Sequence, residues 1–376
     1  MSLRSEFLKK PIRRVVLKVG SSLLSETDGQ RKRMLQLLRQ EILAIRKRGI
    51  EAILVSSGAV STGRHAIQNR FQIQPQRNPS LSRRQALSAI GQHRLMADYD
   101  RVFLDAGVPV AQMLITARDF RDRRAYLNIG HTIQELMQIG ALPIVNENDT
   151  VATDELQFGE NDILSAACAA LFRADLLVIL TSVEGFLFEG ERLRETDRIT
   201  QALRKAAGGP DGPGRGGMQT KLRAGELCLI SGNSLAILPG HHASPLTSFL
   251  AGEDIGTLIC RSGEDDRPRL RARKRWLLFA ASRGGVVIDA GAGRALKERG
   301  SSLLPAGVRS TYGSFISGDV IEIRSEQDEP LGRGIANYSQ PEIGRMLGLT
   351  GREIQARGLA TRGIELIHRD DLAIEY

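Results

Sequence analysis

The chain has 376 residues, of which 41% are hydrophobic and 25% are charged, and its formal net charge is +9. A chain of this length is too long to fold around one ordinary hydrophobic core, and its length predicts about two domains. The composition excludes a disordered chain, and no apolar run approaches the ~20 residues that a membrane span requires.

The positive charge raises the hypothesis of nucleic-acid binding, because clustered Lys and Arg neutralise phosphates. From Arg271 to the C-terminus, however, 16 Lys and Arg residues stand against 13 Asp and Glu residues, a net charge of only +3. The excess is spread along the chain, which favours a solvated basic surface suited to anionic substrates. The basic run from Arg267 to Arg275 is interpreted as a solvated linker that leads into a core tryptophan, Trp276.

The cysteines and the N-terminus indicate the compartment. Cys168, Cys228 and Cys260 are far apart, odd in number and without metal-ligand spacing, which predicts buried free thiols in a reducing compartment. The N-terminal segment, 1–14, is basic but lacks the apolar core of a signal peptide. We therefore expect a cytoplasmic location.

Buried strands and helices alternate along the first 240 residues. The segment from His65 to Ser80 is rich in Gln, Arg and Pro and is predicted to be a surface loop. Hydrophobic periodicity predicts strands at 13–19, 52–55, 108–113, 142–145, 176–180 and 234–238, and helices at 31–48, 81–106, 122–139, 163–172, 199–207 and 220–230.

This alternation predicts an α/β fold, an αβα sandwich with a mainly parallel central sheet. Ligands of such sheets bind beyond the carboxyl ends of the strands. Around 261–269 the pattern lapses, and short β runs separated by glycines follow, with helical turns near 292–297 and 341–347. We expect a large α/β domain at 1–262, a linker at 263–273 and a small β-rich domain at 274–376.

The polar stretch from Val145 to Asp162 connects two apolar segments. It contains the pair Asn-Asp twice, at 148–149 and at 161–162, each time at the edge of an element that is predicted to be buried. Polar side chains held there by rigid neighbours can face a small, charged ligand.

The glycine run at 208–217, followed by Met218-Gln219-Thr220-Lys221, is the strongest local indication of phosphate binding. Glycines let backbone N–H groups approach an anion closely, and a helix N-terminus adds partial positive charge. The sequence is not a Walker A loop. A flexible connection and a surface lysine are the structural alternatives.

Lys18, in Lys18-Val-Gly-Ser-Ser, is a weaker indication, because a lysine at a strand end can simply extend into solvent. In a parallel sheet, however, the strand ends gather Lys18, Ser57, residues 146–149 and Thr181 along one rim. Two lysines, glycine-backed amides and carboxylates suit phosphoryl transfer, which needs positioning and charge neutralisation. Adjacent His241 and His242 have no partner spacing, so no protein-held metal is predicted.

Five motifs, read in order, resemble the glutamate 5-kinase branch of the amino acid kinase family. They are Lys18-Val-Gly-Ser-Ser, Val55-Ser-Ser-Gly-Ala, Val145-Asn-Glu-Asn-Asp-Thr, Gly159-Glu-Asn-Asp and Gly216-Gly-Met-Gln-Thr-Lys. The C-terminal motifs Arg273-Lys-Arg-Trp, Gly300-Ser-Ser-Leu-Leu-Pro and His368-Arg-Asp-Asp resemble a PUA domain. The resemblance covers nearly the whole chain.

The resemblance implies ATP-dependent phosphorylation of the side-chain carboxylate of L-glutamate to glutamyl 5-phosphate, the first step of proline synthesis. It implies Mg²⁺ bridging the nucleotide phosphates, feedback inhibition by proline and a homo-oligomer. A carboxylate nucleophile with a free pKa of about 4.3 is already ionised at neutral pH, so no general base is needed.

The resemblance also implies the site residues. Lys18 and Lys221 would neutralise the transferring phosphoryl group and Asp162 would hold them. Glutamate would contact Ser57, Asp149 and Asn161, and the nucleotide would contact Lys18, Thr181, Ser182, Arg215, Gly216, Gly217, Met218, Gln219, Thr220 and Lys221.

One position departs from the family pattern. The family commonly has Thr-Asp where this chain has Thr181-Ser182, so a carboxylate contact to the nucleotide is missing. Two alternative functions stay open at this stage. One is another carboxylate kinase of the same family, and the other is an RNA-binding protein acting through its PUA domain.

Overall fold

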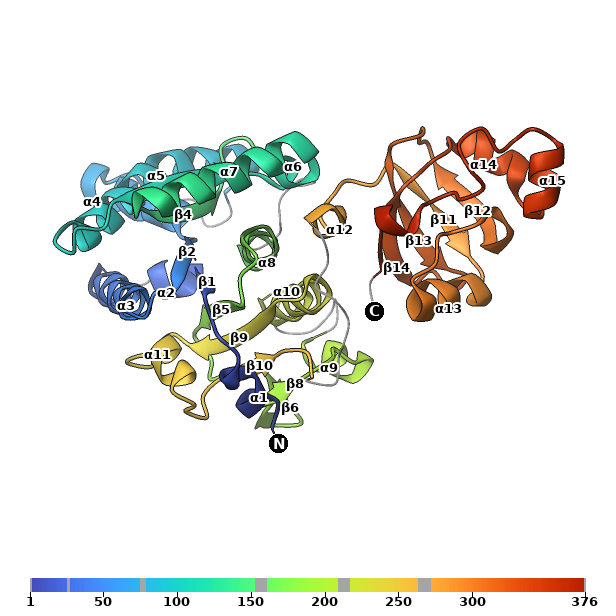
Figure 1. The fold of residues 1–376 in the computed structure, drawn as a ribbon. Coiled ribbons are helices and arrows are strands. Elements are labelled where there is room, and N and C mark those ends of the chain that lie inside the picture. Colours follow the sequence, from blue (N-terminus) through green and yellow to red (C-terminus); the bar gives the residue numbers. More distant parts are fainter. Residues whose placement is uncertain are drawn as a thin grey trace. The chain divides into compact units, whose positions relative to one another are not determined.

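A computed structural model describes residues 2–25, 28–74, 79–152, 161–208, 217–262 and 272–374. These residues divide into two compact units (Figure 1). The first consists of Met1–Asp119 and Arg124–Pro268, and the second of Phe120–Arg123 and Arg269–Tyr376. Each unit has its own sheet and its own hydrophobic core, as expected for a chain of this length.

The first unit is built on an eight-stranded sheet in the order β3-β4-β2-β1-β5-β9-β10-β8. All neighbours pair in parallel except β10, which is antiparallel to β9. The mainly parallel α/β fold predicted from the sequence is therefore confirmed. The strands are β1 Arg14–Val19, β2 Glu51–Val55, β3 Val110–Ile115, β4 Leu142–Glu147, β5 Leu176–Thr181, β8 Glu195–Thr196, β9 Ser234–Pro239 and β10 Thr257–Ile259, with a separate pair of β6 Leu187–Phe188 and β7 Glu191–Arg192.

Helices cover both faces of this sheet. On one face, side chains of β1 pack with α3 and α5 in a single hydrophobic core. On the other face, α8 packs against β1 and β5, and α10 packs against α8 and β9. The helices are α1 Leu3–Lys9, α2 Ser21–Ser25, α3 Asp28–Lys47, α4 Ala59–Phe71, α5 Leu81–Leu104, α6 Ala117–Arg121, α7 Arg123–Ile139, α8 Asn161–Phe172, α9 Gln201–Ala206, α10 Gly217–Ser231 and α11 Pro245–Leu250.

Side-chain alternation along β1 explains how the sheet prepares a site. Val15, Leu17 and Val19 belong to the core shared with α3 and α5. Because successive side chains of a strand point to opposite faces, Lys18 lies on the opposite side, where α8 packs. The lysine that interrupts the apolar run is thus directed at the start of α8.

The loop predicted from His65 to Ser80 is wrong in its first part. Helix α4 continues to Phe71, and Ala66 and Ile67 are buried in it. The sequence there shows little apolar periodicity, because α4 packs through glycine rather than through large side chains. A Cβ on Gly63 would lie 1.9 Å from the Leu87 carbonyl oxygen of α5, so the two helix backbones are in contact.

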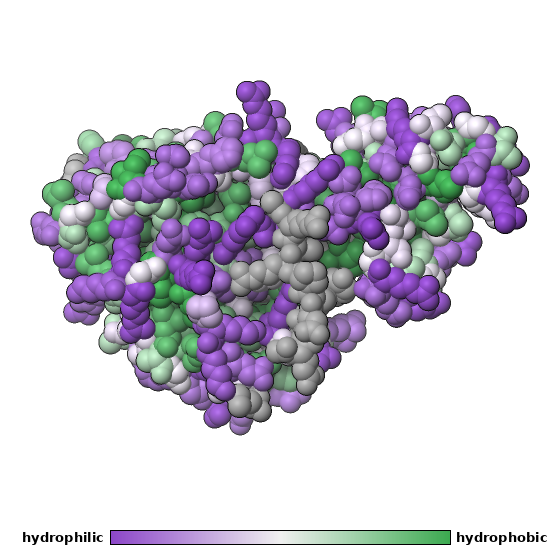
Figure 2. All heavy atoms as spheres, viewed as in Figure 1, coloured by the Kyte–Doolittle hydropathy of each residue, from purple (hydrophilic) through white to green (hydrophobic). Residues whose placement is uncertain are grey.

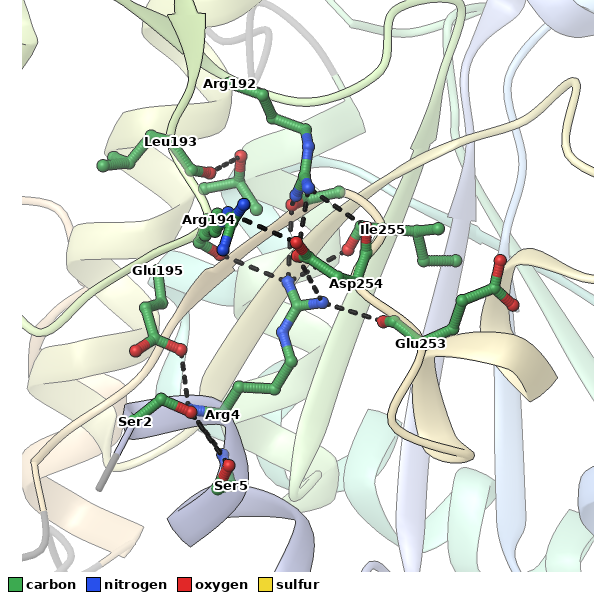
Figure 3. Close-up of polar contacts among 12 residues, drawn as sticks. Ser2, Arg4, Ser5, Arg192, Leu193, Arg194, Glu195, Glu253, Asp254 and Ile255 are labelled. Carbon is green, nitrogen blue, oxygen red and sulfur yellow. Dashed lines mark hydrogen bonds and ion pairs between the residues drawn. The ribbon is translucent and has the colours of Figure 1, made fainter.

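The N-terminal helix α1 was not predicted, and a buried arginine attaches it to the sheet edge (Figure 3). Arg4 is 7% exposed and pairs with Asp254 at 3.4 Å. The backbone N–H groups of Leu3 and Arg4 donate to the Glu195 carboxylate at 2.9 and 2.8 Å. The guanidinium also donates to the backbone carbonyls of Arg194, Glu253, Ile255 and Gly256.

The second unit is a five-stranded sheet in the order β12-β11-β13-β14-β15, with β11 and β13 parallel and the other pairs antiparallel. The expected β-rich domain is therefore present. Trp276 is 8% exposed, so the prediction of a buried tryptophan is confirmed. The elements are β11 Gly284–Ile288, β12 Val308–Gly313, β13 Val320–Ser325, β14 Pro330–Ile335, β15 Leu372–Ile374, α12 Ala272–Leu277, α13 Ala290–Arg299, α14 Gln340–Met346 and α15 Gly351–Ala356, with 3-10 turns at Pro305–Gly307 and Arg369–Asp371.

Hydrophilic side chains cover most of the visible surface of both units, and hydrophobic areas are interspersed among these side chains (Figure 2). The three cysteines are buried, as predicted. Within the described ranges, no helix combines the length and the apolar character needed to cross a membrane.

Candidate active site

The carboxyl ends of β1, β2, β4 and β5 border one cavity of about 930 Å³ in the first unit. Lys18, Ser57, Asn146 and Thr181 line it from these strand ends. Parallel strands present their carboxyl ends at the same edge, so the rim predicted from the sequence is present. The N-terminal residues of α2, α8 and α10, together with residues of α4 and of the first turns of α5, form the rest of the wall.

One corner of the cavity holds two lysines on a single carboxylate; we call Lys18, Asp162 and Lys221 the phosphate corner. Lys18 Nζ lies 2.6 Å from Asp162 Oδ1, and Lys221 Nζ lies 3.1 Å from Asp162 Oδ2. Asp162 is fully buried, while Lys18 and Lys221 are 4% and 8% exposed. Both lysines therefore line the cavity, and the buried Asp162 carboxylate holds their ammonium groups.

Burial by itself raises the pKa of Asp162, but the charges of Lys18 and Lys221 and their hydrogen bonds outweigh burial. The pKa of this carboxyl group consequently lies below its usual range, and Asp162 is ionised at neutral pH. Two positive charges share one negative charge, so the corner has an excess positive charge. Such a corner attracts a phosphate group.

The first turn of α10 supports the phosphate corner. Thr220 Oγ1 donates to Asp162 Oδ2 at 2.9 Å, and Lys221 Nζ donates to the Gly217 carbonyl at 2.7 Å. Gly217 and Met218 line the cavity. The N-terminus of a 15-residue helix therefore faces the cavity, and its backbone N–H groups favour an anion there.

Another corner consists of two neutral amides, one hydroxyl and one carboxylate; we call Ser57, Asn146, Asn161 and Asp149 the acceptor corner. Asn161 Nδ2 donates to Ser57 Oγ at 2.9 Å, to Asn146 Oδ1 at 2.9 Å and to the Ser56 carbonyl at 2.6 Å. Asn161 and Asp162 are the first two residues of α8. Adjacent residues of a helix point in different directions, so one helix end serves both corners.

Asp149 is held in the acceptor corner by α5. Ser88 Oγ donates to Asp149 Oδ2 at 2.9 Å. Burial raises the pKa of Asp149, and the Ser88 hydrogen bond and the charge of Arg84 oppose this shift only in part. A half-buried carboxylate of this kind gains from a positively charged ligand, because the ligand compensates the cost of burial.

The remaining predicted residues are distributed as follows. Thr181 and Ser182 line the cavity, whereas Gln219 lines a separate hollow of about 280 Å³ beside Arg204 and Glu226. Arg215 and Gly216 lie outside the described residues. His241 Nε2 lies 2.8 Å from Glu184 Oε1, and His242 Nε2 lies 3.4 Å from Glu253 Oε1.

The sequence interpretation missed Asn146 as a structural centre of the acceptor corner, and it missed Ser88 and Gln92 entirely. Asn146 Nδ2 donates to Gln92 Oε1 at 2.9 Å. A usable indication existed, since Ser88 and Gln92 are four residues apart and buried on one face of a long helix. Buried polar side chains on an apolar helix face need partners.

Comparison with known proteins identifies the family. The model of the amino acid kinase family matches residues 13–238, and the model of the PUA domain matches residues 284–357. The PUA match lies within the five-stranded second unit.

Curated relatives match nearly the whole chain. A protein named glutamate 5-kinase from Deinococcus radiodurans is 40% identical over 96% of this chain and 99% of its own length. Another from Thermus thermophilus is 38% identical over 96% and 97%, and one from Syntrophotalea carbinolica is 36% identical over 99% and 100%. The predicted resemblance is thereby confirmed. The chain belongs to the amino acid kinase family, in the group of relatives named glutamate 5-kinase, and carries a C-terminal PUA domain.

Proposed function

We propose that this chain transfers the γ-phosphoryl group of ATP to the side-chain carboxylate of L-glutamate, which gives glutamyl 5-phosphate and ADP and begins proline synthesis. The observation that carries the proposal is the presence of both corners in one cavity. The names of the relatives agree with this reaction.

In the proposed reaction a carboxylate oxygen of glutamate forms a bond to the γ-phosphorus, and the bond from that phosphorus to the bridging oxygen of ADP breaks. The nucleophile is ionised at neutral pH, so no proton has to be removed. Lys18 and Lys221 would neutralise the charge of the transferring group. Asp162 would hold the two ammonium groups at the separation that its two oxygens define.

The acceptor corner would bind the α-amino and α-carboxylate groups of glutamate. Asp149 supplies a negative charge for the ammonium group, and Ser57 and Asn161 supply a hydroxyl and an amide. For the nucleotide we propose contacts with Thr181, Ser182 and the segment 215–221; Gln219 faces another hollow, so its contact stays a prediction.

Mg²⁺ is proposed as a companion of the nucleotide phosphates. Among the described residues, no group of three His, Cys, Asp or Glu side chains is arranged to hold a metal ion. Both oxygens of Asp162 are engaged by lysines. These residues do not form a protein cage for the ion, and Mg²⁺ is commonly held largely by substrate phosphates and water.

A hydroxamate assay tests the function. Hydroxylamine converts an acyl phosphate to a hydroxamate, which is measured as its coloured ferric complex. The hydroxamate should form when ATP, Mg²⁺ and L-glutamate are all present, and omission of any one should abolish it. Product with aspartate or N-acetylglutamate but not with glutamate would assign the chain to another carboxylate kinase of the family.

RNA binding through the PUA domain is the second candidate, favoured by the match at 284–357 and weakened by the small net charge of the tail. Tight binding of RNA by the full chain that weakens steeply with salt would support it. Inhibition by proline and homo-oligomerisation stay predictions, which a proline titration and a measurement of molar mass in solution would test. A cytoplasmic location is proposed from the three buried thiols.

A further inference from the structure

Helix α5 carries three buried polar side chains, Ser88, Gln92 and Tyr99, which we call the α5 polar face. They are 3%, 8% and 0% exposed. Their spacings of four and seven residues place them on one side of the helix. None of them lines the large cavity, so each can influence a ligand only through another residue.

Each member of the α5 polar face contacts a different residue around the acceptor corner. Ser88 donates to Asp149, Gln92 accepts from Asn146, and the Tyr99 hydroxyl lies 2.9 Å from Ser56 Oγ. Ser56 directly follows β2, Asn146 lies near the end of β4, and Asp149 follows β4. A single rigid helix therefore holds two strand ends in register with each other.

Backbone groups at both ends of the chain of amides fix the direction of its hydrogen bonds. The Ser56 carbonyl can only accept, so it requires the Nδ2 branch of Asn161. The Glu147 N–H can only donate, at 2.9 Å, so it requires the Oδ1 branch of Asn146. Asn146 Oδ1 then accepts from Asn161, and its Nδ2 is left for Gln92 Oε1.

The glycines at the α4–α5 contact explain why the α5 polar face can reach these residues. A Cβ on Gly91 would lie 1.8 Å from the Ala59 carbonyl oxygen. Gly91 directly precedes Gln92, and Ala59 directly follows the Ser57-Gly58 pair. The close backbone contact thus sets the position of Gln92 relative to the segment that carries Ser57.

We propose that the α5 polar face is the positioning element of the acceptor corner, and that Gln92 is a positioning residue that holds the Asn146 side chain in place and, through it, Asn161. With Gln92 in place, Asn161 Nδ2 is engaged by its neighbours and Asn161 Oδ1 is left for the cavity that Asn161 lines. Without this acceptor, Asn146 Nδ2 loses its buried partner, and the Asn146 side chain, then held by the Glu147 N–H and by Asn161, can shift and weaken its contact with Asn161. The inference rests on the proposed function.

A pair of substitutions separates positioning from bulk. Gln92→Met keeps the side-chain length and removes the acceptor, whereas Gln92→Glu keeps an acceptor at the same place. We expect Gln92→Met to raise the KM for glutamate roughly 10-fold, the scale of one lost buried hydrogen bond, while the KM for ATP changes less than about twofold. Gln92→Glu should recover most of the loss.

Ser231→Ala is the matched control, because Ser231 is buried and hydrogen-bonded to Asn233 at 2.6 Å but does not line the cavity. It should lower the melting temperature without changing either KM. A purely structural Gln92 would behave like Ser231, and that outcome would overturn the inference.

The proposed function and the positioning role of Gln92 would be refuted by different results. Absence of glutamate-dependent hydroxamate with the unchanged protein would refute the proposed function, and the KM comparison would then use whichever amino acid is accepted. A crystal structure of the Gln92→Met variant gives a readout independent of activity. Unchanged Asn146 and Asn161 side chains in it would refute the positioning role.

Discussion

The two corners of the cavity are held by different forces. The phosphate corner is an ion-pair triad, in which a fully buried carboxylate fixes two lysines at 2.6 and 3.1 Å. The acceptor corner is a chain of largely neutral hydrogen bonds that runs from α5 through Asn146 to Asn161. Charge is strong and tolerant of direction, whereas amides are weak and directional, so the first corner suits charge neutralisation and the second suits recognition.

This difference predicts that changes in the phosphate corner affect turnover and changes in the acceptor corner affect substrate affinity. The largest effect is expected for Lys221→Ala, which removes one of two cations from the transferring phosphoryl group. The kcat should fall about 100- to 1,000-fold, as for the loss of one transition-state donor, while glutamate binding persists. Steady-state kinetics and calorimetric titration with glutamate measure the two quantities, with the exposed Lys205→Ala as control. Normal turnover would remove Lys221 from the catalytic residues.

Asp162→Asn should rank second in its effect on turnover. The substitution keeps the shape but leaves two buried lysines without their counter-charge, so we expect kcat to fall about 10- to 100-fold and the free energy of unfolding to fall by about 3 kcal/mol. In the unchanged protein the depressed pKa of Asp162 means that its stabilisation is present above the ordinary carboxyl range and is lost as the pH falls through the lowered pKa. Chemical denaturation across pH should show that the variant lacks this acid-dependent loss.

Ser57→Ala should have an intermediate effect confined to the acceptor corner. Loss of the hydroxyl that accepts from Asn161 should raise the KM for glutamate about 10-fold and leave the KM for ATP nearly unchanged. Ser310→Ala, on the exposed side of the second unit, is the control. An equal rise in both KM values would contradict the division between the corners.

The smallest effect is expected from Ser88→Ala, and it appears in the pH profile. Burial raises the pKa of Asp149 and the Ser88 hydrogen bond lowers it, so removing that bond raises the pKa further. If ionised Asp149 binds the ammonium group, kcat/KM for glutamate declines on the acid side as Asp149 is protonated. The acid limb should therefore move to higher pH. An unmoved limb would show that Asp149 does not bind the ammonium group in its ionised form.

Local patterns in the sequence located the parts of the site that depend on strand ends and helix starts. Lys18 interrupts an apolar strand, and Asn161 and Asp162 begin a helix of small residues, so each position was recognisable without tertiary contacts. The hydrophobic pattern failed to predict a helix where glycine, rather than large apolar side chains, makes the packing contact. Helix α4 was predicted partly as a loop because Gly63 supplies its contact with α5.

By itself, the sequence determined the alternating α/β order, the rim of polar residues at the strand ends and the family, because these follow from periodicity and from contiguous motifs. Only the tertiary structure decided that Asn161 and Asp162, adjacent on α8, serve different corners, and that Gln92 supports Asn146 from 54 residues away. Such contacts depend on how helices and strands pack, and no local pattern contains the distance between segments that are remote in the chain.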